Sequence, residues 1–230
     1  MRRTVMLVVL SLVVSMPAAA QEWEEFKSTR DSFAALFPGQ PAVSEGIYTT
    51  KSSYELPMRV YSGAMGGGRF SVTVVDFTGI EKLGLERYKK CPAGAETCLG
   101  NENLAGLGYW KHEIRGAPMF ALQNILTRPG VKLTELFWNQ QDLIQGVVAH
   151  LTNADGSRTH AYITMYELKL YIAEGTVPKG MPEPALFVQA VTWLDKDGNN
   201  IRFRQMYNHE IHGLREAPVP PTQRGTLAGR

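Results

Sequence analysis

Apolar and polar residues alternate along most of the chain, and this pattern predicts a protein built mainly from β-strands. The clearest example is RFSVTVVDF at 69–77, where β-branched and aromatic residues occupy nearly every second position. Comparable stretches predict further strands at 22–27, 32–37, 46–52, 54–64, 119–126, 132–138, 143–152, 158–165, 168–176 and 201–207. Short turns between several neighbours, such as NADGS at 153–157, favour antiparallel pairing.

Two segments carry helical spacing instead. The stretch 80–90 places Ile80 and Leu83 on one face, and 185–194 places Phe187, Val191 and Leu194 at i, i+4 and i+7, which predicts a mostly buried helix. Many strands with one early and one late helix indicate the α+β class, an antiparallel β-sheet flanked by helices.

The N-terminus has the features of an export signal. Arg2 and Arg3 precede an apolar run at 4–16, and small residues at Ala18 and Ala20 form a signal-peptidase site. The run is shorter than the ~20 residues of a membrane-spanning helix. We therefore expect a signal peptide at 1–20, a periplasmic protein without a stable membrane anchor after cleavage, one α+β domain at 21–213 and a disordered tail at 214–230. An uncleaved anchor is the alternative.

The charge balance argues against nucleic acid as a partner. The chain has 24 Lys and Arg against 22 Asp and Glu, and loss of Arg2 and Arg3 with the signal leaves 22 of each. A nucleic-acid-binding protein needs a basic surface to displace counterions. The near-neutral charge of the mature chain therefore gives no indication of nucleic-acid binding.

The chain has two cysteines, Cys91 and Cys98. In an exported protein, two nearby cysteines predict a structural disulfide. A reactive or metal-binding pair stays open as the alternative.

The motif NHEIHG near the C-terminus contains the residue types of a zinc site. His209 and His212 are three positions apart, however, whereas zinc proteases place two histidines four apart on a helix. On a strand, the two histidines would point to opposite faces. A native metal site is not expected here, although one of them could join a ligand from elsewhere.

A second histidine pair flanks the turn at 153–157. A three-residue loop at 154–156 would place His150 directly opposite His160, with Cβ atoms about 5 Å apart, close enough to share a metal ion. The alternative is two half-exposed residues of a sheet. No nucleophile motif, dinucleotide fingerprint or complete calcium loop accompanies them, so we expect neither an enzyme nor a cofactor.

Two segments resemble a known family. The N-terminal EWEEFKSTRDSFAALFPGQPAV and the late KLYIAEGTVPKGMPEPALFVQAVTWLDKDGNNIRF are similar to the PsbP-like superfamily, which includes DcrB-like bacterial envelope proteins. The resemblance spans 22–207 and is closest to uncharacterised secreted proteins of alphaproteobacteria. It implies a PsbP-like antiparallel sheet flanked by helices, and it transfers no catalytic residues.

These observations predict a secreted periplasmic protein that binds an envelope protein or supports envelope assembly without catalysis. A small-ligand or metal carrier is the alternative, and a hydrolase of unfamiliar type is a third possibility.

Overall fold

The computed structural model describes residues 22–90 and 109–201. The strands and helices within these ranges are β1 (Trp23–Ser28), β2 (Phe33–Pro38), β3 (Ala42–Thr49), β4 (Glu55–Met65), β5 (Gly68–Asp76), α1 (Ile80–Lys89), α2 (Tyr109–Leu126), β6 (Lys132–Gln141), β7 (Ile144–Thr152), β8 (Arg158–Tyr166), β9 (Lys169–Val177), α3 (Ala185–Gln189) and β10 (Thr192–Trp193). No helix within these ranges is long and apolar enough to cross a membrane.

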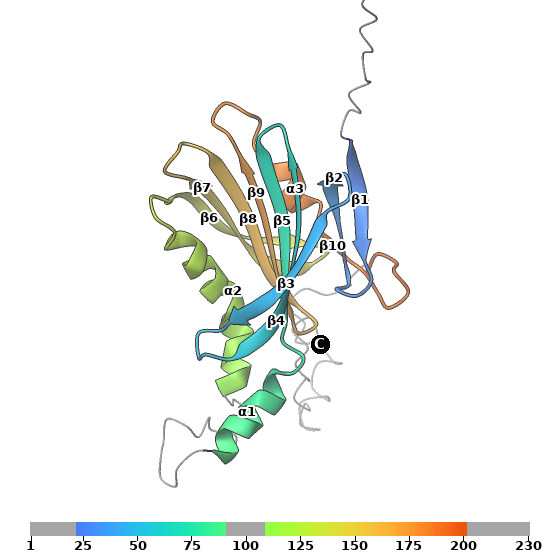
Figure 1. Ribbon diagram of the computed structural model, residues 1–230, viewed down its shortest axis with the longest axis vertical. Coiled ribbons are helices and arrows are strands. Elements are labelled where there is room, and N and C mark those ends of the chain that lie inside the picture. The colour runs from blue at the N-terminus through green and yellow to red at the C-terminus, as the bar shows by residue number, and fades with distance from the viewer. Residues whose placement is uncertain (1–21, 91–108, 202–230) are drawn as a thin grey trace, which may run out of the picture.

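A seven-stranded antiparallel sheet forms the centre of the molecule, with strand order β3-β4-β5-β9-β8-β7-β6 (Figure 1). Most of its strands lie within a few residues of the predicted positions. Strands β3, β4 and β5 pair in sequence order, and so do β6, β7, β8 and β9. Strand β9 also pairs with β5, which joins the two groups into one sheet. The order leaves β3 and β6 as the two edges of this sheet.

Helix α2 covers one face of the sheet and packs mainly against β8. Its buried apolar side chains recur at helical spacing and include Ile114, Ala117, Ala121 and Ile125. The prediction of a strand at 119–126 is therefore wrong. Pro118 lies inside the helix and, as a residue that normally breaks helices, obscured the helical periodicity on either side of it.

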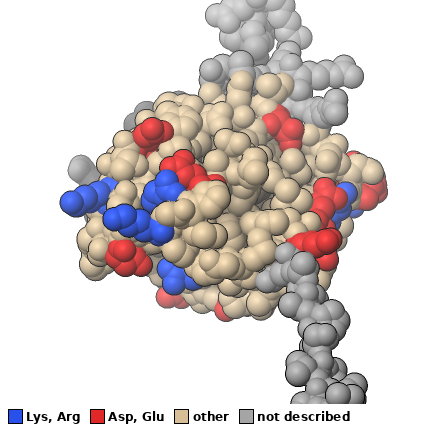
Figure 2. All heavy atoms as spheres, turned by 90° about the horizontal axis from the view of Figure 1, so that it is seen from above, with Lys and Arg blue, Asp and Glu red and all other residues tan. Residues whose placement is uncertain are grey.

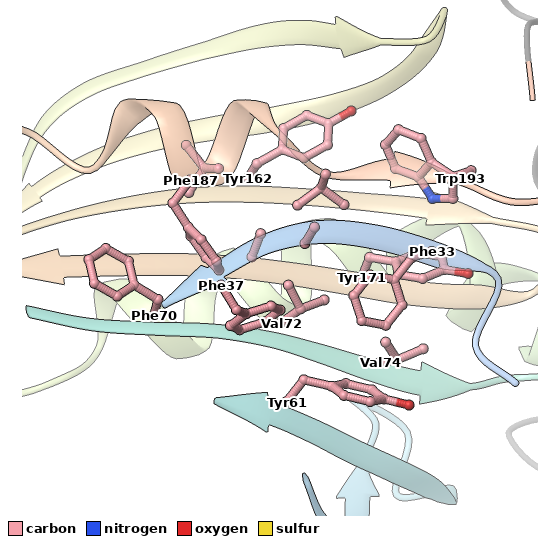
Figure 3. Packing of buried hydrophobic residues seen from close by; sticks show 14 of the residues in the cluster. Phe33, Phe37, Tyr61, Phe70, Val72, Val74, Tyr162, Tyr171, Phe187 and Trp193 are labelled. Carbon is pink, nitrogen blue, oxygen red and sulfur yellow. The ribbon is translucent and has the colours of Figure 1, made fainter. Parts of the chain in front are cut away.

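The opposite face is covered by a three-stranded sheet, β1-β2-β10, together with α3. Between the two layers lies an aromatic core, in which Phe33, Phe37, Tyr171, Phe187 and Trp193 are buried (Figure 3). The antiparallel sheet is confirmed, but the protein is richer in strand than the predicted α+β arrangement of a sheet flanked by helices. A second sheet, and not helices alone, covers this face.

The predicted helix at 185–194 is wrong in its second half. Helix α3 ends at Gln189, and Thr192 and Trp193 pair with Ala34 and Phe33 of β2. The free edge of β2 offers backbone hydrogen bonds, and these outweigh the local helical pattern. Leu186, expected on a mostly buried helix, is 79% exposed.

A buried ion pair joins the turn between β1 and β2 to the main sheet. The Arg59 guanidinium donates to both carboxylate oxygens of Asp31, with Nε 2.6 Å from Oδ2. The Tyr61 hydroxyl donates to the same Oδ2, and the Tyr171 hydroxyl donates to the Asp31 carbonyl oxygen at 2.7 Å. Burial opposes ionisation of Asp31, but hydrogen bonds from Arg59 and Tyr61 outweigh it and hold the pKa of Asp31 below its usual value.

Candidate functional site

The predicted pairing of His150 with His160 is confirmed. The turn between β7 and β8 has a three-residue loop, closed by a hydrogen bond from the Asn153 N–H to the Ser157 carbonyl oxygen at 2.9 Å. Gly156 has a φ of 79° and takes the left-handed position that such a loop requires. This loop length sets the register and places His150 opposite His160.

The two imidazole rings stack in parallel, with centroids 3.7 Å apart and planes 9° apart. Each ring also faces a carboxylate: His150 Nδ1 lies 3.0 Å from Glu135 of β6, and His160 Nε2 lies 3.7 Å from Glu183. The His160 side chain is only 4% exposed, and its Nδ1 has no hydrogen-bond partner among the described residues. Beside them is a cavity of about 330 Å³, which Arg158 also lines.

The surroundings of His160 favour its neutral form. Burial lowers the pKa of His160, and the neighbouring His150 and Arg158 lower it further, whereas Glu183 and Glu135 act in the opposite direction. Neutral rings can stack closely without charge repulsion. The lowered pKa of His160 thus favours an uncharged His160 ring in the stack.

Acid is therefore expected to destabilise the protein through His160. The unfolded chain takes up a proton near the ordinary histidine pKa of about 6.5, while the folded chain takes it up only at lower pH. The unfolding free energy should fall as pH drops below about 6.5, and urea denaturation at about pH 7.5 and about pH 5 would measure this loss. His160→Gln should reduce the difference between the two pH values. His112→Gln, at an exposed position of α2, is the control, and an equal reduction in both variants would contradict the assignment.

The geometry of the pair does not support the shared metal ion considered above. Imidazole nitrogens donate lone pairs in the plane of the ring, so parallel stacked rings cannot direct two of them at one ion. Among residues 22–90 and 109–201, no group of three or more His, Cys, Asp or Glu side chains could hold a metal ion. The other predicted candidates, Cys91, Cys98, His209 and His212, lie outside the described residues.

The edge strand β6 is the most exposed apolar element of the main sheet. Trp138 is 70% exposed, and Leu133, Leu136 and Phe137 are each between 43% and 47% exposed. Leu136 and Trp138 lie opposite Ala149 and Val147 of β7, so they share the face that α2 covers further along the sheet.

The other face of β6 lies beside the histidine pair. Phe137 packs edge-on against His150, with ring centroids 5.6 Å apart, and Glu135 is the carboxylate partner of His150. The edge strand and the histidine pair therefore form one continuous surface. The predicted strand at 132–138 gave no indication of this surface, since its position at a sheet edge depends on the order of distant strands.

One face of the molecule carries charged side chains of both signs. On the face seen in Figure 2, basic and acidic side chains are mixed, and uncharged residues cover most of the area. This face carries no basic stripe of the kind that follows a nucleic-acid backbone.

These features define an α+β protein with an antiparallel central sheet and an open apolar edge. No family model matches the chain, and no curated protein matches it. Among solved structures, it is similar to the solution structure of cyanobacterial PsbP (CyanoP) from Synechocystis sp. PCC 6803, with 11% identity and a TM-score of 0.37 over 73% of this chain and 87% of that chain. The name of that protein is the name of the superfamily that the sequence resembles. The closer resemblance to DcrB-like and alphaproteobacterial proteins stays a prediction.

Proposed function

We propose that this protein is a secreted periplasmic accessory protein that binds a protein partner without catalysis. An extended segment of the partner would pair with β6 as an additional strand of the sheet. The observation that carries the proposal is the exposed edge formed by Leu133, Leu136, Phe137 and Trp138. Natural proteins protect edge strands with charges, prolines or covering segments, because an unprotected edge pairs with other chains. β6 has ten residues and contains no proline. Its two charges, Lys132 and Glu135, and the irregularity in its pairing with β7 between Leu133 and Glu135 all lie before Leu136, so the rest of the strand lacks such protection.

Strand addition would use two kinds of contact. The outward backbone N–H and C=O groups of β6 would supply hydrogen bonds, and side chains on alternate positions would supply specificity. On the α2 face, Leu136 and Trp138 offer apolar area to side chains of the added strand. An aromatic residue of this size commonly dominates the binding energy of an interface.

A photoreactive amino acid at Gln140, which is exposed on β6, is expected to capture the partner in the cells that make the protein. Adding Leu136→Lys should abolish the adduct, because a charged lysine at a sheet edge opposes strand pairing. The matched control places the photoreactive residue at Ile47, which is 62% exposed on the opposite edge strand, β3. The proposal fails if Gln140 gives no adduct, or if the adduct survives Leu136→Lys.

A further inference from the structure

We infer that the strand that pairs with the free edge of β6 is β6 of a second copy, so that two chains form one continuous antiparallel sheet about a two-fold axis. This inference rests on the proposed function and names the partner of the same edge. Two-fold dimers are the commonest symmetric assemblies, and their interfaces must be self-complementary. The sequence and exposure of β6 meet this requirement.

The charges at the two ends of β6 are arranged for antiparallel pairing of the strand with a second copy of itself. Lys132 opens the strand, and Asp142 follows its last residue in an exposed turn. When two copies run in opposite directions, the basic start of each strand lies beside the acidic end of the other. Opposite charges across two strands stabilise the pair, and like charges directly opposed destabilise it.

The apolar residues select the register. Directly opposed residues of an antiparallel pair lie on the same face, so a two-fold axis through Phe137 places Leu136 of each copy opposite Trp138 of the other. These residues are 47% and 70% exposed in the single chain, and the pairing would bury both of them in each of the two copies. An axis through Glu135 would oppose two carboxylates. An axis through Trp138 would oppose Leu136 to the polar Gln140.

The pairing would also bring the two histidine cavities together on one face. Phe137 lies on the face of His150, and it would meet its own copy at the axis. Glu135 lies two positions away from the axis and contacts His150 on the neighbouring strand β7. Each cavity would therefore lie close to the seam between the two copies.

Sedimentation equilibrium of the full mature chain tests the inference. The wild-type protein is expected to form dimers, and Leu136→Glu or Trp138→Lys alone should weaken self-association by at least about 30-fold, the effect of losing one interface hot spot. The double variant with Leu136→Glu and Trp138→Lys should recover the dimer, because the register opposes each new acid to a new base. A matched control, Ile47→Lys on β3, should leave the dimer intact.

Several outcomes would overturn the inference. A wild-type chain that stays monomeric at all concentrations excludes it, as do single variants that still form dimers. A double variant that stays monomeric excludes the proposed register. Circular dichroism of each variant confirms that the fold is unchanged.

The same experiments separate this inference from the proposed function. A monomeric protein whose photoreactive Gln140 captures only a different protein would overturn the dimer and leave strand addition at β6 in place. The absence of any adduct would overturn both.

Discussion

Asp31→Asn is expected to lower the free energy of unfolding by about 3 to 5 kcal/mol, the range seen when one partner of a buried ion pair is removed. The Asp31 side chain is fully buried and that of Arg59 is 8% exposed. Asparagine keeps the shape of the side chain but leaves the Arg59 charge buried without a counter-ion. Urea denaturation, with the midpoint and slope measured separately, gives the loss.

An exposed ion pair supplies the control for this measurement. Arg30 and Glu45 lie 2.8 Å apart, but both side chains are more than 60% exposed. Glu45→Gln should therefore change stability by at most about 1 kcal/mol. The assignment of Asp31 as the link between the two sheets is wrong if both variants lose the same amount.

A double variant separates the charge from the packing. Replacing Asp31 by leucine and Arg59 by methionine removes both charges while filling the space with apolar groups. Such exchanges are often neutral or stabilising for buried ion pairs. We expect the double variant to regain much of the stability that Asp31→Asn loses. If it does not, the hydrogen bond from Tyr61 to the carboxylate, and not the charge balance, holds the turn in place.

Local patterns in the sequence predicted those parts of the fold that depend on local interactions. The turn at 153–157 fixed the register of β7 and β8, since a three-residue loop with Gly156 at the left-handed position allows only one pairing. That register placed His150 beside His160. The cavity next to them also needs Glu135 of β6 and Glu183, which follows β9, and the turn could place neither of them.

Long-range contacts explain the features that the sequence did not reveal. Asp31 lies in a turn and Arg59 on a strand, 28 positions apart, and nothing local indicates that they meet in the core. β10 forms because β2 lies beside it. The strand order likewise decides that β6 is an edge and that its apolar residues face solvent instead of a core.

Trp193→Ala is expected to lower the free energy of unfolding by about 3 to 5 kcal/mol, as for other large aromatic residues truncated in a core. Trp193 is fully buried, and its ring lies 6.1 to 6.3 Å from those of Tyr162, Tyr166 and Tyr171. In the small sheet, Trp193 of β10 also pairs with Phe33 of β2. Alanine would leave a cavity at the point where the small sheet meets the large one.

Trp193→Phe is the conservative variant and should cost only about 1 to 2 kcal/mol. The indole Nε1 is buried without a hydrogen-bond partner among the described residues. Phenylalanine therefore loses packing area but no hydrogen bond within this part of the chain. Leu186→Ala, on the exposed side of α3, should change stability by no more than about 0.5 kcal/mol. If phenylalanine proves as harmful as alanine, the indole N–H has an essential partner beyond the described residues, and the packing argument for Trp193 is insufficient.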